Sequence, residues 1–256
     1  MQLLQQKEEV DGNQDNDDLL VSNEIEIIKQ NDERFPESLK KLPKGRSPEK
    51  LYVQSEDYDF NFQKCVAIIG TRKPSQEGLE LSFEIANRLV QHGYTIVSGL
   101  ARGIDDAAHR GALDNHGSTI AVLEGLPDVY PPEHKELADA IKKTCCVITE
   151  YFPNEKNIKF ALVKRNEIIA ALSDAIIVVE SNESGGAHYA IDYGQKLEKL
   201  IITMEPRANN DEFANGFAKF LSSGAYPAKT VEDVIQILDS YEKPKKNTLD
   251  DFTDSR

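Results

Sequence analysis

Six short apolar runs alternate with longer amphipathic stretches between residues 65 and 206, and this alternation constrains the fold more than any other feature. The runs are apolar on both faces, as strands buried inside a parallel sheet are. The order predicts an α/β fold with a Rossmann-like, doubly wound, mostly parallel sheet and helices on both faces. The predicted strands are Val66–Ile69, Thr95–Val97, Ile120–Leu123, Cys146–Thr149, Ala175–Val179 and Leu200–Met204. The predicted helices are Glu77–Gln91, Ile104–Asn115, Glu133–Lys143, Phe160–Leu172 and Ala187–Lys196.

Two segments precede this predicted core, which spans residues 65–206. Residues 1–33 are rich in acidic and amide side chains, so we expect a disordered tail with a short helix near Glu24–Gln30. Residues 34–64 carry repeated prolines. They predict an extended lead-in that wraps the edge of the domain.

Two further segments follow the core. Residues 207–242 are predicted to begin with a polar loop at Arg207–Gly216 and to end in an amphipathic helix. The helix is indicated by Thr230-Val-Glu-Asp233, which resembles a capping box ahead of an apolar stripe. Residues 243–256 are charged and are predicted to form a mobile tail.

The chain is acidic, with 44 Asp and Glu against 30 Lys and Arg and a formal net charge of −14. Coating of duplex DNA needs clustered cations that release counterions, so this balance argues against it and requires any nucleic-acid site to be focal. No apolar run reaches the roughly 18 residues that cross a bilayer, and the N-terminus shows no signal-peptide pattern. We therefore expect a cytoplasmic protein with no membrane association.

The reactive residue types show no spacing that predicts a metal or redox site. The three cysteines form no Cys-x-x-Cys pair, and the five histidines are scattered. Cys145 and Cys146 lie in an apolar run, which favours core packing. We expect no metal and no cofactor.

The residues after each predicted strand are the candidates for chemistry, because ligands of open α/β sheets bind beyond the carboxyl ends of the strands. Gly70-Thr-Arg-Lys-Pro-Ser75 follows the first strand. Gly70 allows close backbone approach, Thr71 and Arg72 offer a hydroxyl and a forked cation, and the following helix N-terminus attracts anions. Taken alone, the motif equally suits a turn with a solvated arginine.

The loop Ser98-Gly-Leu-Ala-Arg-Gly-Ile-Asp105 follows the second strand. Its two glycines allow a tight turn whose N–H groups can surround a phosphate, and Arg102 can make a bidentate contact. Asp105 would brace the loop or read a ribose or base edge. His109, one helical turn later, would face the same side. For Asp105 and His109, capping the helix and bracing the loop is an equally good interpretation.

Three later stretches meet the same predicted sheet edge. They are Glu124-Gly125 with Tyr130-Pro131, the basic Lys164-Arg165-Asn166, and Glu180 with Ser184-Gly-Gly186. A Walker lysine loop and a Gly-x-Gly-x-x-Gly motif are both missing from the sequence, so an NTPase or dinucleotide enzyme is not expected. The sequence shows no nucleophile–base pair that would require catalysis.

Together these motifs resemble the DprA/Smf family of DNA-processing proteins over roughly residues 34–204. The family's Gly-Ser/Thr-Arg turn is matched by Gly70-Thr-Arg72. Its most specific signature, Ser-Gly-x-Ala-x-Gly-Ile-Asp followed by Ala-His, is matched at Ser98–Asp105 and Ala108-His109. Further matches are Gly117–Leu123 with Tyr130-Pro131, Thr149-Glu-Tyr151, Arg165–Ser173 and Val178–Gly186.

The resemblance implies a protein that binds single-stranded DNA in a basic pocket, protects incoming strands and helps to load a RecA-type recombinase during natural transformation. It implies a homodimer and no catalytic step. By match, the DNA contacts would be Arg72, Arg102, Lys164, Arg165 and Asn166. The pocket would be shaped by Gly70, Thr71, Ser98, Gly99, Gly103, Asp105, His109, Glu180, Ser184, Gly185 and Gly186.

Two acidic departures from the family pattern bear on DNA affinity. The family's Arg-Asn-Arg becomes Arg165-Asn166-Glu167, and its glycine-rich turn after the third strand becomes Glu124-Gly125-Leu126-Pro127. Both changes add negative charge near the predicted pocket, and we expect them to weaken its attraction for phosphate.

Two other functions remain open at this point. Gly185-Gly-Ala-His-Tyr-Ala-Ile-Asp192 faintly resembles the Gly-Gly-x-Gly-Thr-x-x-Glu turn of LOG-type nucleoside-monophosphate hydrolases, although His188 and Tyr189 replace its small residues. A nucleotide-sensing or protein-interaction module with a degenerate pocket is the other alternative.

Overall fold

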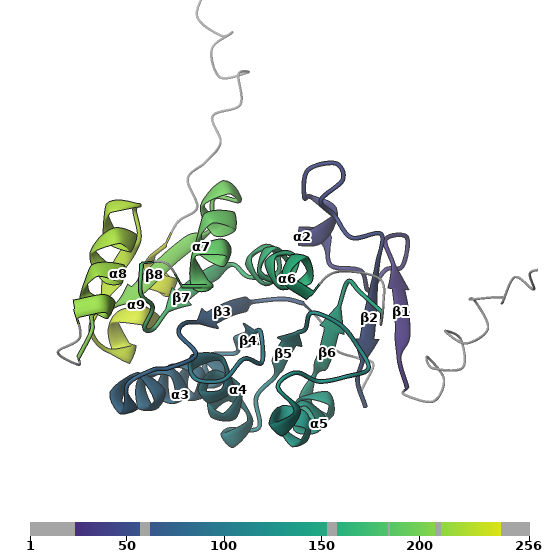
Figure 1. Ribbon diagram of the computed structural model, residues 1–256, viewed down its shortest axis with the longest axis horizontal. Helices are drawn as coiled ribbons and strands as arrows, with labels where there is room; N and C mark the ends of the chain where they lie inside the picture. Colours follow the sequence, from purple (N-terminus) through teal and green to yellow (C-terminus); the bar gives the residue numbers. More distant parts are fainter. Residues whose placement is uncertain (1–23, 57–61, 153–157, 184, 208–210, 242–256) are drawn as a thin grey trace, which may run out of the picture.

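A nine-stranded sheet carries the structure, a computed structural model that describes residues 24–56, 62–152, 158–183, 185–207 and 211–241 (Figure 1). Its strands are β1 (Glu26–Lys29), β2 (Lys50–Gln54), β3 (Cys65–Ile69), β4 (Thr95–Ser98), β5 (Thr119–Val122), β6 (Cys146–Thr149), β7 (Ala175–Val178), β8 (Leu200–Met204) and β9 (Tyr226–Ala228). Their spatial order is β1-β2-β6-β5-β4-β3-β7-β8-β9. Strands β3 to β9 pair in parallel, whereas β1 and β2 pair antiparallel at one edge.

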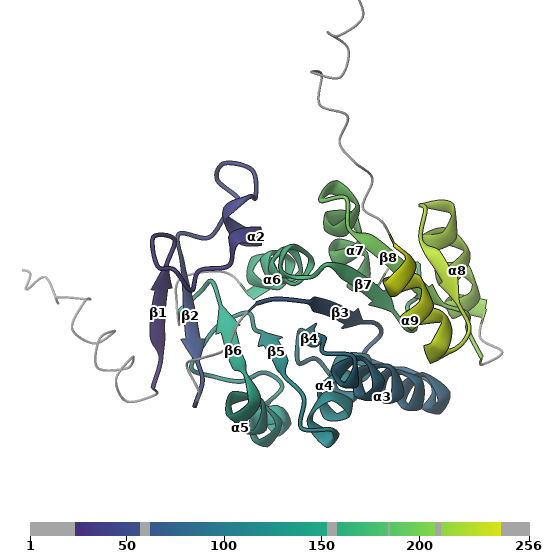
Figure 2. The same ribbon diagram turned by 180° about the vertical axis from the view of Figure 1, so that it is seen from behind.

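Helices cover both faces of this sheet. They are α2 (Glu37–Lys40), α3 (Gln76–Gln91), α4 (Ile104–Asp114), η1 (Pro132–His134), α5 (Lys135–Thr144), α6 (Ile158–Leu172), α7 (Ala187–Lys196), α8 (Asp211–Ser222) and α9 (Val231–Ser240). Helices α3, α4, α5 and α9 lie on one face, and α2, α6, α7 and α8 lie on the other (Figures 1 and 2). No helix among the described residues is both long and apolar enough to cross a membrane.

The chain changes direction across the sheet at β3. From β3 it steps through β4 and β5 to β6, with α3, α4 and α5 as the connections; α6 then crosses the opposite face to β7, on the other side of β3. The turns after β3 and β7 therefore leave toward opposite faces. Such a switch point leaves a crevice at the carboxyl ends of the strands, where ligands of open α/β sheets bind.

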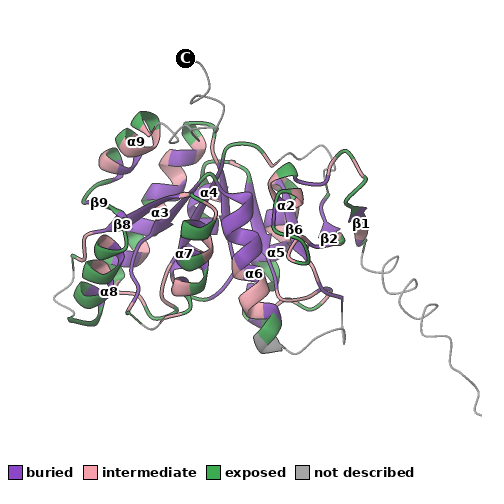
Figure 3. Ribbon diagram, turned by 90° about the horizontal axis from the view of Figure 1, so that it is seen from above, coloured by how far each residue is buried: buried purple, intermediate pink, exposed green. Residues whose placement is uncertain are grey.

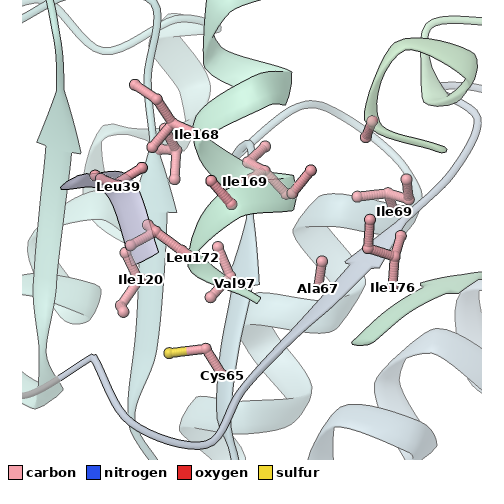
Figure 4. Close-up of a cluster of buried hydrophobic side chains, with 14 of the residues drawn as sticks. Leu39, Cys65, Ala67, Ile69, Val97, Ile120, Ile168, Ile169, Leu172 and Ile176 are labelled. Carbon is pink, nitrogen blue, oxygen red and sulfur yellow. The ribbon is translucent and has the colours of Figure 1, made fainter. Parts of the chain in front are cut away.

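Helix α6 is packed into the core rather than laid on the surface. Its residues Ile168, Ile169 and Leu172 are buried against the sheet, with Val97 and Ile120 in the same cluster (Figure 4). Most of the helix is buried or half-buried because α2 and α7 flank it (Figure 3). The core thus fixes the helix that carries the basic Lys164–Arg165 pair.

The predicted fold class, the six central strands and their five helices are confirmed, with ends that match or differ by at most two residues. The capping box is confirmed too: Thr230 Oγ accepts from the N–H of Asp233 (3.1 Å), and Asp233 Oδ2 accepts from that of Thr230 (3.0 Å). The predicted tails at residues 1–23 and 243–256, together with Ser184, lie outside the described residues.

Two local predictions are wrong, and a third is right in part. The helix expected near Glu24–Gln30 is strand β1, because pairing with β2 buries Ile28. The lead-in is extended at β2, near the edge of the sheet, but it also contains the short helix α2. The polar loop expected at Arg207–Gly216 is largely helix α8, which buries Phe213 and Phe220, two turns apart on one face.

A test of the packing of α3 against α4 is available at Gly111 in the middle of α4. A Cβ there would collide with the backbone carbonyl oxygen of Phe83, so the two helices touch through this glycine. Although alanine is the better helix former, Gly111→Ala is expected to lower the free energy of unfolding by about 2 kcal/mol, the usual scale of overpacking. Chemical denaturation measures this. Gly125→Ala is the control, since its nearest neighbour would be the Tyr151 carbonyl oxygen at 3.8 Å; equal losses in the two variants would contradict close packing.

Candidate nucleic-acid interface

A cavity of about 600 Å³ lies at the switch point, beyond the carboxyl ends of β3 and β7. The β3–α3 turn, the β4–α4 loop, one face of α6 and the start of α7 form its walls. Its polar and glycine residues are Gly70, Thr71, Arg72, Lys73, Asp105, Arg165, Asn166, Ser181, Asn182, Gly185, Gly186 and Tyr189.

A second cavity of about 270 Å³ adjoins the first. Because several residues line both, the two cavities lie side by side, and together they are called the channel below. The shared residues are Arg72, Lys73, Ala101 and Arg165. The second cavity adds Arg102, Glu124, Tyr130 and Pro131.

Positive charge is concentrated along the channel. Four cations line it against two carboxylates, in a chain whose net charge is −14. This is the focal basic site that an acidic chain needs for binding a polyanion. The cations are Arg72, Lys73, Arg102 and Arg165, and the acids are Asp105 and Glu124.

The cations at the mouth of the channel are available to a ligand. Arg72 and Lys73 are exposed, and neither has an ion pair among the described residues. Arg102 lies 2.5 Å from Glu133, but both side chains are more than half exposed, and exposed pairs of this kind contribute little. The Glu133 carboxylate accepts hydrogen bonds from its own backbone N–H and from Arg102. These bonds hold its pKa below the usual value, so the carboxylate stays charged.

Arg165 lies deeper, with its guanidinium buried in the wall of the channel. Its Nη1 donates to the carbonyl oxygen of Gly99 (2.9 Å) and lies 3.4 Å from Glu124 Oε2. Its Nε is buried without a hydrogen-bond partner in the described part of the chain. A Cβ on Gly99 would be 2.7 Å from the guanidinium carbon, so a side chain there would displace the guanidinium from this position.

Asp105 both braces the β4–α4 loop and lines the channel. Its Oδ2 accepts from the N–H groups of Gly99 (3.2 Å) and Ala101 (3.4 Å). Burial raises the pKa of this carboxyl, and the positive charge of Arg165 and the loop N–H groups oppose that rise. Loop bracing is thus the contact that the structure shows for Asp105.

Glu180 shapes the channel from outside it. Its carbonyl oxygen accepts from the N–H of Thr71 (2.7 Å), and its carboxylate accepts from the N–H and hydroxyl of Ser75 (2.8 and 2.6 Å). These bonds tie the end of β7 to the turn after β3. Gly70 is required there because a Cβ would be 2.6 Å from the same carbonyl oxygen.

Gly103 brings the second loop against the first. Its φ of +84° is in the left-handed region, and a Cβ would be 2.5 Å from the Thr71 carbonyl oxygen. Only glycine meets both conditions without strain. The two loops therefore touch, and their cations lie side by side.

Lys164 is turned away from the channel. Its Nζ lies 3.3 Å from Glu167 Oε2 and donates to the carbonyl oxygen of Arg46 (3.3 Å). Glu167 Oε1 in turn lies 2.6 Å from Arg46 Nε. Residues 164 and 167 are one helical turn apart on the face of α6 opposite Arg165 and Ile169. The acidic residue at position 167 is thus paired outside the channel.

Ser98 and His109 are buried beneath the channel rather than in it. Ser98 Oγ donates to the carbonyl oxygen of Ile68 (2.6 Å), which fastens β4 to β3. The Thr119 hydroxyl donates to the Ile96 carbonyl oxygen (3.1 Å), so it accepts from His109 Nδ1 (2.7 Å). The proton of His109 therefore lies on Nδ1. Burial lowers the pKa of His109 to about 3, so its imidazole is neutral near pH 7.

The model of the family of DNA recombination-mediator protein A matches residues 26–239. The chain belongs to this family. The resemblance to DprA/Smf proteins seen in the sequence is thereby confirmed.

Three family members illustrate the similarity. The DNA processing protein DprA of Bacillus subtilis is 30% identical over 205 residues, which cover 78% of this chain and 66% of that protein. The X-ray structure of DprA from Streptococcus pneumoniae superposes with a TM-score of 0.76 at 29% identity, covering 88% of this chain and 78% of that one. The structure of DNA processing protein A from Helicobacter pylori has been described in terms of its single-stranded DNA binding mode. It superposes with a TM-score of 0.73 at 26% identity, covering 85% of this chain and 97% of that one. The chain spans 40 to 66% of the length of the curated relatives that it matches.

Within this DprA/Smf fold, the structure gathers most of the residues that the sequence selected. Arg72, Arg102, Arg165 and Asn166 line the channel, and Lys164 does not. Of the pocket-shaping residues, five line the channel, and the others in the described part lie behind its walls. The five are Gly70, Thr71, Asp105, Gly185 and Gly186.

Several channel residues were not selected as site residues from the sequence, and among them are Lys73, Tyr130 and Tyr189. Lys73 follows Arg72 directly, and its place in the same turn was the available signal. Tyr130 and Tyr189 were noted as parts of motifs, but their exposure beside the channel depends on how the loops fold.

The buried neutral His109 predicts a pH dependence of stability. The unfolded chain takes up a proton on this histidine near pH 6.5, whereas the folded chain does so only near 3. The contribution is therefore complete above about pH 6.5 and is lost as the pH falls toward the folded pKa. Between about pH 7.5 and about pH 5.5, the free energy of unfolding is expected to fall by about 1 kcal/mol more in the wild type than in His109→Gln. Urea denaturation measures the difference; parallel pH profiles would contradict it.

Proposed function

We propose that this chain binds single-stranded DNA in the channel, with the phosphates on Arg72, Lys73 and Arg102 at its mouth and Arg165 in its wall. The observation that carries the proposal is the concentration of these cations at the switch point of a strongly acidic chain. The single-stranded DNA binding mode described for the Helicobacter pylori relative supports the same ligand.

The dimensions of the channel favour a single strand over a duplex. Its larger cavity, about 600 Å³, is in the range that holds a small ligand such as a nucleotide. A duplex keeps its bases stacked inside and offers this hollow only its phosphates. A single strand can place phosphates on the rim and an unpaired base inside. We propose binding, not turnover, as the role of the channel.

The primary test is a binding titration with oligo-dT, matched duplex and AMP at several salt concentrations. We expect a preference for oligo-dT and a negative slope of log affinity against log salt. Cleavage of a nucleoside monophosphate without oligo-dT binding at low salt would favour the hydrolase alternative and overturn the proposal.

Replacing a cation at the mouth should weaken binding by one phosphate contact. Arg72→Ala is expected to lower the affinity for oligo-dT roughly tenfold and to reduce the salt slope by about 0.7, the value for one phosphate of a single strand. Arg88→Ala is the matched control, because Arg88 is a cation on α3 paired with Glu232 and outside the channel. Equal loss in both variants would show that charge alone, and not the channel, governs binding.

The two acidic departures from the family pattern should behave differently. Glu124 lies beside Arg165 in the channel, whereas Glu167 is paired with Arg46 and Lys164 on the far side of α6. Glu124→Gln is therefore expected to raise the affinity for oligo-dT roughly threefold or more, since it removes a like charge from the path of the phosphates. Glu167→Gln changes the net charge equally and should not raise it. Fluorescence anisotropy distinguishes the two, and an equal gain would contradict this placement.

Family membership supports a wider role that goes beyond the channel. We propose that the protein acts in the cytoplasm as a homodimer, protects incoming single strands and assists a RecA-type recombinase in loading. Light scattering tests the dimer. The loading is tested by strand exchange with a RecA-type recombinase, on DNA already covered by a single-strand binding protein. If this protein does not accelerate the strand exchange, it does not assist loading.

A further inference from the structure

Large apolar side chains are exposed at four described positions, and two of these lie in the channel. Tyr130 is 57% exposed and Tyr189 is 50% exposed; the other two are Phe160 and Tyr226. Tyr189 lines the cavity at the switch point, and Tyr130 lines the adjoining one. The two tyrosines thus line different cavities of the channel.

The channel tyrosines differ from the other two in their surroundings. Phe160 lies 6.4 Å from the ring of Tyr151, and Tyr226 lies 6.1 Å from that of Tyr241. No ring contact joins Tyr130 or Tyr189 to another aromatic side chain among the described residues. A single exposed aromatic residue is ordinary on a protein surface. Two unstacked rings in two adjoining cation-lined cavities are not explained by packing.

The cations between the rings complete the arrangement. Arg72, Lys73 and Arg165 line both cavities, so they lie between the part that holds Tyr189 and the part that holds Tyr130. Proteins that hold single strands without reading their sequence combine such a basic track with aromatic faces on which bases stack. Each base has a π-face, so this contact tolerates any sequence, and a paired base has both faces already covered.

We propose that Tyr130 and Tyr189 are two base-stacking subsites, which take unpaired nucleobases in the two cavities of the channel while the phosphates between them lie on the shared cations. This rests on the proposed single-strand binding and adds its recognition of bases. The bases held at the two subsites would enter separate cavities, which the stacked bases of a duplex do not permit.

The first experiment uses the absence of tryptophan from the sequence. Tyr130→Trp and Tyr189→Trp each introduce one tryptophan, whose emission is quenched when a base stacks on it. Oligo-dT is expected to quench both reporters, and an abasic deoxyribose-phosphate oligomer of equal length should quench neither. Tyr226→Trp, on β9 and outside the channel, is the control and should not respond. Equal responses of all three, or none from the channel reporters when oligo-dT is bound, would overturn the subsites.

The second experiment measures affinity with the same two oligomers. Tyr130→Ala and Tyr189→Ala are each expected to weaken oligo-dT binding roughly fivefold or more and to leave binding of the abasic oligomer unchanged. Tyr130→Phe and Tyr189→Phe keep the ring and should restore wild-type affinity. Both tyrosines are exposed, so these variants should fold normally.

The outcomes separate this inference from the function on which it rests. If the wild type binds neither oligomer, the proposed single-strand binding fails and the subsites fail with it. If the wild type binds both oligomers equally and the alanine variants match it, single-strand binding stands through the backbone and the stacking subsites are wrong.

Discussion

The channel depends on the close contact of three loops at the carboxyl ends of β3, β4 and β7. Glu180, at the end of β7, holds the β3–α3 turn through the N–H of Thr71 and through Ser75. Gly103 lets the β4–α4 loop touch the same turn. A side chain at Gly70 or Gly103 would separate these loops, and the cations that they carry would no longer share one hollow.

Helix α6 performs two tasks because its opposite faces are chemically different. One face presents Arg165 and Asn166 to the channel. The other joins Lys164 and Glu167 to Arg46, whose guanidinium also lies 5.0 Å from the centre of the Tyr193 ring. The residue that departs from the family's third basic position therefore anchors the segment that precedes the core. The charge of Glu167 thus contributes to packing, and the acid that lines the channel beside Arg165 is Glu124.

The central strands could be predicted because each is apolar on both faces, which is typical of strands buried inside a parallel sheet. Strands β1 and β9 could not, since β1 depends on its partner β2, and β9 contains an exposed Tyr226 and only three residues. Helix α8 was hidden by its polar start, although Phe213 and Phe220 carry a helical spacing. In the channel, turn motifs identified the loops correctly. The directions of Lys164 and Arg165 depended on the rotation of α6, which only the packing of Ile168, Ile169 and Leu172 against the sheet defines.

The ion pairs Arg102–Glu133 and Arg165–Glu124 give two of the channel cations a carboxylate of the protein itself as counterion. A phosphate that arrives at either cation has to exchange with a tethered anion, which cannot diffuse away and is not diluted by lowering the salt. The tethered carboxylates release no anion into solution, so the ions that the salt dependence counts come from the strand. The carboxylates would rebind the cations as soon as a strand leaves.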